Sequence, residues 1–174
     1  MQAQDIEAHL EDLGWELYNM GVSSPVRILM IGGAFMLTQM HSMRMTNDVD
    51  ILLKDIEDPT TSPLYRVFKA AVRAVASRRQ IPSTWVNDVI GDFLRDLGTV
   101  PNGVLWRTYA VLEVYVPEVE YILALKLLAG RQKDNRIFVC SVSGYLFRLA
   151  TRHNSWSIDT FLKKPSKSII WIRY

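Results

Sequence analysis

The side chains in this chain best suited to chemistry are two carboxylates two residues apart, Asp48 and Asp50. Alternate residues of an extended strand point to the same face, with Cα atoms about 6.5 Å apart, so the two acids can converge on one divalent cation. Aspartate is depleted in strands, and two carboxylates on one face repel each other unless a cation lies between them. Magnesium suits such a pair because it binds carboxylate and phosphate oxygens while keeping several waters. The alternative is a strand end with two solvated acids.

A second feature, the pair Gly32-Gly33, follows an apolar run over residues 26–31. Glycine lets the backbone approach a phosphate closely and leaves N–H groups free to donate. The pair lacks the lysine and Ser/Thr of a Walker loop and the third glycine of a dinucleotide-binding turn. It could also be a tight strand-to-helix turn with no ligand. A phosphate-binding turn together with a metal-binding pair is what a nucleotidyl-transfer site requires, and the combination favours the functional interpretation.

Helices and strands must position these residues, and their hydrophobic patterns predict an α/β (α+β) protein with a mixed sheet flanked by helices. We expect one domain over residues 1–174, with a core at 22–116 and a helical C-terminal portion at 117–174. The segment 156–174 is either a strand or a segment that packs on a partner. The patterns predict helices over 4–20, 34–40, 64–78, part of 83–98, 118–130 and 135–152, and strands over 26–31, 48–53, 104–109 and 111–116.

Composition excludes several classes of protein. The chain has 174 residues, 49% of them hydrophobic, which is enough for a core and too many for a disordered chain. The formal net charge of +2 argues against a nucleic-acid wrapper. Since Cys140 is the only cysteine, no intrachain disulfide can form. The N-terminal residues lack the apolar core of a signal peptide, and the longest apolar stretch, 28–37, is shorter than the ~20 residues that span a bilayer. We therefore expect a cytoplasmic protein with no membrane partner.

The spacing of these residues also resembles a known family. Gly32-Gly33 followed by Arg44-x-Thr46-x-Asp48-x-Asp50 resembles the signature of the nucleotidyltransferase fold superfamily, the DNA polymerase β-like fold. The likeness is closer to small bacterial nucleotidyltransferase-like proteins, which include the toxins of AbiE-type (type IV) toxin–antitoxin systems. A later stretch resembles further motifs of that group, with Lys126 on an apolar helix followed by Arg131 and Asp134. The two stretches together span most of residues 26–138.

The resemblance implies a nucleotidyltransferase-like sheet and a role for each matching residue. Gly32 and Gly33, with Arg44 and Thr46, would hold the nucleotide, and Asp48 and Asp50 would bind Mg²⁺. Lys126 would neutralise phosphate charge, and Asp134 would orient or activate part of the site. Catalytic members of the fold carry a third carboxylate on a later strand, for which Glu113 is the candidate. From the residues alone, Glu113 could equally lie on a solvated strand face, and Lys126 could point to the surface or into a polar pocket.

The implied function is Mg²⁺-dependent transfer of a nucleoside monophosphate from an NTP to a hydroxyl. The acceptor would be an RNA such as a tRNA, a protein or a small molecule. A basic predicted helix offers either a phosphate-contacting surface or a solvated face; its cations are Arg66, Lys69, Arg73, Arg78 and Arg79. The alternative is a weak or inactive interaction module, for instance one bound to a cognate antitoxin. Asn135-Arg136-Ile137 favours this alternative, because members of the group usually have a further acid there.

Overall fold

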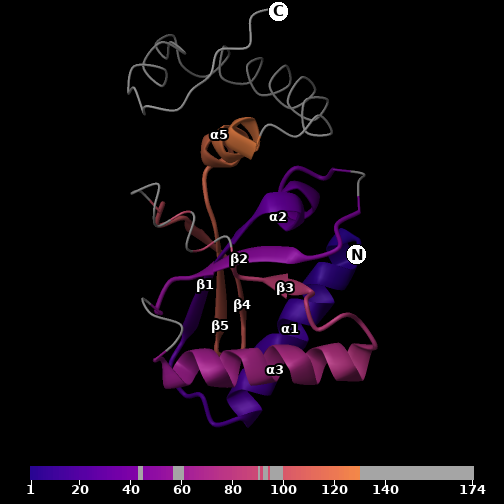
Figure 1. The fold of residues 1–174 in the computed structure, drawn as a ribbon, viewed down its shortest axis with the longest axis vertical. Helices are drawn as coiled ribbons and strands as arrows, with labels where there is room; N and C mark the ends of the chain where they lie inside the picture. The colour runs from indigo at the N-terminus through magenta and orange to yellow at the C-terminus, as the bar shows by residue number, and fades with distance from the viewer. Residues whose placement is uncertain (43–44, 57–60, 90, 92–93, 95–99, 130–174) are drawn as a thin grey trace, which may run out of the picture. The chain divides into compact units, whose positions relative to one another are not determined.

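The computed structural model describes residues 1–42, 45–56, 61–89, 91, 94 and 100–129. The chain divides into two compact units, Met1–Leu128 and Ala129–Tyr174, of which the first contains the sheet. The predicted single domain over 1–174 stays a prediction. The elements, drawn in Figure 1, are α1 (Ala3–Asn19), β1 (Val26–Ile31), α2 (Gly32–Thr38), β2 (Val49–Leu53), α3 (Pro63–Arg79), β3 (Val86–Asn87), β4 (Val104–Tyr109), β5 (Leu112–Val116) and α5 (Val119–Ala129).

The five strands form one mixed sheet in the order β3-β2-β1-β5-β4. The central strand β1 pairs antiparallel with β2 and parallel with β5, while β2 pairs parallel with β3 and β4 pairs antiparallel with β5. The position of β1 follows from its composition, because every residue of the strand except Arg27 is buried. The mixed sheet with flanking helices confirms the predicted α+β class.

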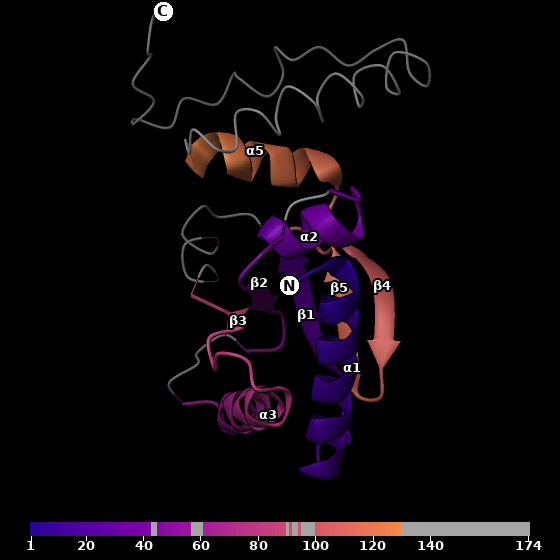
Figure 2. The ribbon, with the colours of Figure 1, turned by 90° about the vertical axis from the view of Figure 1, so that its right-hand side faces the viewer.

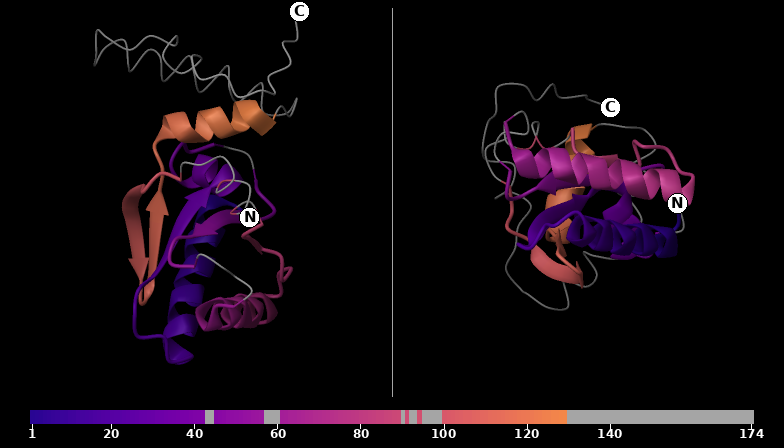
Figure 3. Two further views of the ribbon diagram at one scale, coloured as in Figure 1. Left: turned by 60° about the vertical axis from the view of Figure 1, so that its left-hand side comes forward. Right: turned by 90° about the horizontal axis from the view of Figure 1, so that it is seen from below.

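One face of the sheet, here called the helix-covered face, packs against α1 and α3 and contains the main core. Figure 3 shows the two helices side by side beneath the sheet. Both helices are amphipathic, and their apolar stripes meet the alternate strand residues that point to this side. Those strand residues are Val26, Ile28, Met30, Val49, Ile51, Leu53, Val86, Leu112 and Val114.

The opposite face of the sheet, here called the site face, carries the other alternate residues of the same strands. Strand register places Ile31 beside Asp50 and Leu29 beside both Leu52 and Tyr115, so these side chains share that face. Leu29 and Ile31 are fully buried there. Because a Cβ on Gly103 would lie 2.7 Å from Leu29 Cδ1, the segment before β4 must cover part of this face.

Most predicted elements are confirmed within a residue or two. The first difference is that the helix after β1 begins at Gly32 rather than at residue 34, so both glycines belong to its first turn. The second is that the predicted helix within 83–98 is wrong at Val86–Asn87, which form β3. Val86 is buried there beside Val49, and this sheet pairing outweighs the local preference of the segment. The helix at 135–152 and the segment 156–174 lie outside the described residues.

Two further expectations concern the surroundings of the protein. Among the described residues, no helix combines the length and the apolar character that a membrane crossing requires. The cytoplasmic location stays a prediction.

Candidate functional site

The centre of the candidate site is a close contact between Gly32 and Asp50. Antiparallel pairing sets Asp50 of β2 beside Ile31, the last residue of β1, and Gly32 follows as the first residue of α2. A Cβ built on Gly32 would lie 2.1 Å from Asp50 Oδ2 and 2.9 Å from its Cγ, and the φ angle of Gly32 is +66°. Both the space and the backbone conformation therefore require glycine at this position.

The second glycine makes a similar contact with the loop before β2. A Cβ on Gly33 would lie 2.6 Å from Thr46 Oγ1. This hydroxyl donates to the carbonyl oxygen of Asp48 at 3.0 Å and lies 3.5 Å from Asp48 Oδ1. The loop is also held to the start of the chain, since the Thr46 N–H donates to the carbonyl oxygen of Met1 at 3.2 Å. The structure thus brings Gly32, Gly33, Thr46, Asp48 and Asp50 together.

Asn87 completes this cluster, and sequence reasoning missed it. The parallel register of β2 and β3 sets Asn87 beside Asp50, and the Asn87 side-chain amide donates to Asp50 Oδ1 at 2.8 Å. The Asn87 side-chain oxygen accepts from the Val89 N–H at 3.3 Å, which fixes the orientation of the amide. The available signal was a polar Asn-Asp pair directly after buried Trp85 and Val86, but the segment was predicted to be helical.

Asp88 belongs to a separate ion pair beside this cluster. Its Oδ1 lies 2.9 Å from Lys69 Nζ of α3, and the Asp88 side chain is largely shielded from solvent. Lys69 Nζ also lies 5.7 Å from the centre of the Tyr65 ring. The pair ties the end of β3 to α3 and neutralises one acid near the site.

Glu113, the predicted third carboxylate, is not brought to this cluster. Glu113 pairs with Arg27, and Asp50 pairs with Ile31 of the same strand. Because Arg27 and Ile31 are an even number of residues apart, Glu113 and Asp50 both lie on the site face. Arg27 lies four residue steps along the strand from Ile31, which corresponds to about 13 Å. Glu113 Oε2 instead accepts a hydrogen bond from the Tyr115 hydroxyl at 2.9 Å, and this bond raises the pKa of Tyr115.

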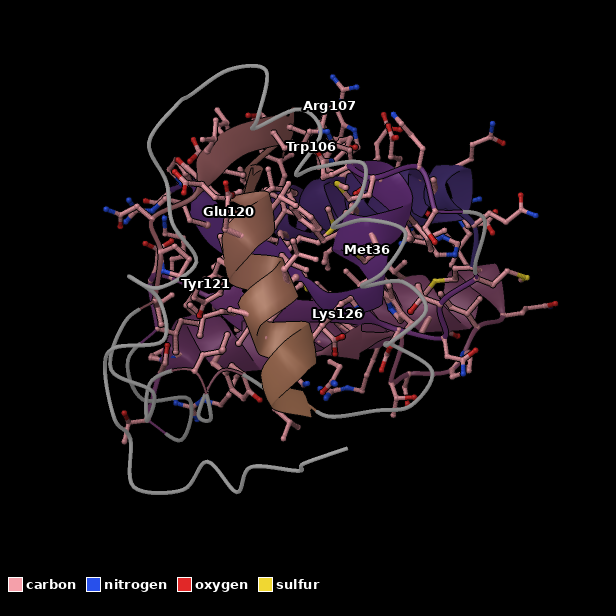
Figure 4. All side chains as sticks on the ribbon, turned by 90° about the horizontal axis from the view of Figure 1, so that it is seen from above. Met36, Trp106, Arg107, Glu120, Tyr121 and Lys126 are labelled. Atoms are coloured by element: carbon pink, nitrogen blue, oxygen red, sulfur yellow. The ribbon has the colours of Figure 1, made fainter. Side chains whose placement is uncertain are left out.

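Lys126 lies on α5, which buries Ile122 and Leu123. The Lys126 side chain is half-buried. Figure 4 shows Lys126 on the side of α5 where Met36 of α2 is labelled, and Tyr121 on the other side. The family resemblance predicts that Lys126 neutralises phosphate charge beside the two glycines that begin α2. That role stays a prediction.

Three of the five basic residues predicted to offer a nucleic-acid surface are paired with acids. Besides Lys69, Arg79 Nε donates to Asp12 Oδ2 at 2.5 Å and Arg78 forms an ion pair with Glu16, so both arginines join α3 to α1. The hydrogen bond from Arg79 lowers the pKa of Asp12. These pairs favour the interpretation of α3 as a solvated, structural face.

Two predicted site residues, Arg44 and Asp134, lie outside the described residues, and so does Arg131 of the later motif. Within the residues that are described, no group of three or more His, Cys, Asp or Glu side chains is placed to hold a metal ion.

Comparison with known proteins gives this chain no relative: no family model matches it, and no match was found among curated proteins or solved structures. The resemblance to nucleotidyltransferases therefore rests on the motif residues themselves. Chemically, the cluster offers two carboxylates beside a glycine turn, with one carboxylate oriented by an amide.

Proposed function

We propose that this chain is a Mg²⁺-dependent nucleotidyltransferase, which moves a nucleoside monophosphate from an NTP to a hydroxyl of an RNA, a protein or a small molecule. The supporting observation is that both halves of the motif pack together, Gly32 against Asp50 and Gly33 against Thr46. A glycine turn that can approach phosphates then lies beside the carboxylates that would share a metal with them.

The donor set fits Mg²⁺ as a metal whose coordination its substrate completes. Magnesium is commonly held by one or two protein carboxylates together with waters and phosphate oxygens, and Asp48 and Asp50 supply two carboxylates. With an NTP, the ion would neutralise charge on the reacting phosphate. Asp48 and Asp50 would hold the ion, and Lys126 is assigned to the phosphates by the family resemblance alone.

The residues around the two acids would orient them. The Asn87 amide holds Asp50 Oδ1, so the direction of this carboxylate is set before any ligand arrives. The Thr46 hydroxyl holds the backbone of Asp48. Orientation in advance lowers the cost of binding, because less side-chain freedom is lost when the ligand is bound.

The test is label transfer from each α-³²P-labelled NTP by the full chain with Mg²⁺, using total RNA and the protein itself as acceptors. Asp50→Asn keeps the shape of the side chain and removes the charge, so transfer should be abolished while thermal unfolding changes little. Glu113→Gln is the matched control and should retain transfer, because Glu113 hydrogen-bonds to Tyr115 away from the cluster. Transfer that persists in Asp50→Asn would mean that the metal site lies elsewhere.

A second function, nucleotide binding with weak or no transfer, is favoured by one observation. The strand beside Asp50 carries an amide, Asn87, where a third carboxylate would complete a metal site and serve as a general base. Asn87→Asp supplies that carboxylate. If the wild-type chain only binds Mg²⁺–NTP, this variant should bind Mg²⁺ more tightly and gain transfer, whereas loss of binding in Asn87→Asp would argue that the amide itself is required.

A further inference from the structure

A second surface, at the opposite end of the sheet from β3, has the properties of a docking site. The sheet ends in β4, and within the described part of the chain no strand pairs with its outer edge. Figure 2 shows β4 as the outermost strand, beside α1. Natural sheets protect such edges with charged residues, prolines, short strands or covering elements, because free N–H and C=O groups attract other strands.

The two edges of this sheet differ in how well they are protected. The β3 edge is only two residues long. The β4 edge is six residues long, with a shift in its register against β5 between Leu105 and Arg107, and none of its residues is buried. Val104 is 69% exposed and Leu105 is 48% exposed, which is unusual for apolar side chains on a free edge. Its one charged residue, Arg107, lies over the ring of Trp106 in the same strand (Figure 4).

The helix beside this edge presents an acidic and aromatic stripe, here called the α1 stripe: Glu7, Glu11, Trp15 and Tyr18. Residues at these spacings lie on one side of a helix. Trp15 and Tyr18 are 52% and 56% exposed and stack edge to face.

The α1 stripe borders β4. A Cβ on Gly14 would lie 2.0 Å from the carbonyl oxygen of Tyr109, so the helix rests directly on the end of the strand. Burial raises the pKa of Tyr109, and the negative charges of Glu7 and Glu11 add to this rise, which is consistent with their lying on the β4 side of α1.

We propose that the outer edge of β4 binds an extended segment of a partner protein, in which apolar and basic side chains alternate, as an additional strand of the sheet. Main-chain hydrogen bonds to β4 would supply affinity. Because side chains alternate between faces, the basic side chains would all point to the helix-covered face and meet the α1 stripe, where Glu7 and Glu11 select cations and Trp15 packs against their methylene stems.

Charge argues against a second copy of this chain as the occupant. Antiparallel pairing of two β4 strands about a two-fold axis would continue the sheet and place both α1 helices on the same face, on either side of the junction. Glu7 and Glu11 of one copy would then face the same residues of the other, and like charges across an interface disfavour association. A basic segment has the complementary charge.

The test uses the full ¹⁵N-labelled chain and two synthetic peptides with blocked ends, one alternating Val and Lys and one alternating Val and Glu. The Val/Lys peptide should shift the amide resonances of residues 104–109 and bind more weakly as salt increases. The Val/Glu peptide should not bind at about 1 mM, a concentration that detects weak complexes. Equal binding of both peptides, or shifts confined to other residues, would overturn the proposal.

Two variants separate edge binding from general charge attraction. Val104→Lys places a cation on the edge, and Val89→Lys places the same charge at a valine that is 77% exposed outside β4. Val104→Lys should weaken binding of the Val/Lys peptide by about tenfold, whereas Val89→Lys should change it by less than about threefold. Glu11→Gln, at an exposed helix position, should weaken binding and its salt dependence. A wild-type dimer in sedimentation that Val104→Lys dissociates would instead identify a second copy as the occupant.

Discussion

Replacing Gly32 by alanine tests the contact on which the candidate site depends. Two costs add in this variant. The φ angle of +66° lies in the left-handed region, which costs an L-residue about 1–2 kcal/mol. The new Cβ would also lie 2.1 Å from Asp50 Oδ2 and 3.0 Å from Asp50 Cβ, so Asp50 must move and give up its bond from Asn87. Crowding of this kind typically costs about 1–3 kcal/mol.

Gly21→Ala is the matched control, because it carries the first cost without the second. Its φ is +87°, and no atom of the described part of the chain lies within 4 Å of the added Cβ. We expect Gly21→Ala to lower the free energy of unfolding by about 1–2 kcal/mol and Gly32→Ala by about 2–5 kcal/mol. For a unit of this size, each kcal/mol corresponds to about 4 °C in the thermal midpoint.

The assay is chemical denaturation of both variants, with a double-mutant cycle that adds Asp50→Ala. This change removes Asp50 Cγ and both carboxylate oxygens, leaving only Cβ near residue 32. In the Asp50→Ala background, the total cost of Gly32→Ala should fall to about the cost of Gly21→Ala. The coupling energy between the two sites is then about 1–3 kcal/mol. Equal destabilisation by the two glycine variants, or a cycle with no coupling, would refute the packing of Asp50 against Gly32.

Three further predictions concern the packing of α1 against its neighbours. Burial, followed by the charge of Arg79, lowers the pKa of His9, so folding favours its neutral form. The contribution of His9 to the free energy of unfolding should therefore be constant above about pH 6.5 and decrease as the pH falls below it. His9→Phe keeps an aromatic ring against Trp85 and should remove this decrease, as measured by urea titrations at several pH values. The Tyr109 hydroxyl is buried and has no hydrogen-bond partner among the described residues, so Tyr109→Phe should leave the unfolding midpoint unchanged or raise it. A marked decrease would indicate a hydrogen bond from this hydroxyl. Gly14→Ala should lower the free energy of unfolding by about 1–3 kcal/mol in the same assay, because its Cβ would lie 2.0 Å from the Tyr109 carbonyl oxygen. This cost outweighs the better helix propensity of alanine.

Local pattern was sufficient to predict much of this fold. The period of apolar residues located α1, and the strand predicted over 26–31, directly before Gly32, has the boundaries of β1. The alternation rule predicted Asp48 and Asp50 on one face of a strand, but β2 begins at Val49, so Asp50 lies in the strand and Asp48 in the loop before it; the two glycines pack against that strand and loop. These features depend on neighbours in sequence, which a pattern records directly.

The features that the sequence did not predict depend on strand register. Asn87 reaches Asp50 because a two-residue strand pairs with β2, and so short a strand has no periodic pattern of its own. The position of Glu113 along the sheet could not be predicted. Glu113 lies on the same face as Asp50, but the parallel pairing of β5 with β1 sets it beside Arg27, at the end of β1 away from Ile31. Register arises from pairing between distant segments, and a single sequence does not record that pairing.

The most direct measurement of the central proposal is thermal unfolding of the full chain with each NTP, with and without Mg²⁺. A ligand that binds only the folded state at about 100 times its Kd stabilises it by about 2.7 kcal/mol. We predict such stabilisation by at least one NTP only when Mg²⁺ is present, its loss in Asp48→Ala and in Asp50→Asn, and its retention in Glu113→Gln. Absence of stabilisation with all four NTPs, or equal stabilisation in Asp50→Asn, would contradict a metal–nucleotide site at Asp48, Asp50 and the two glycines.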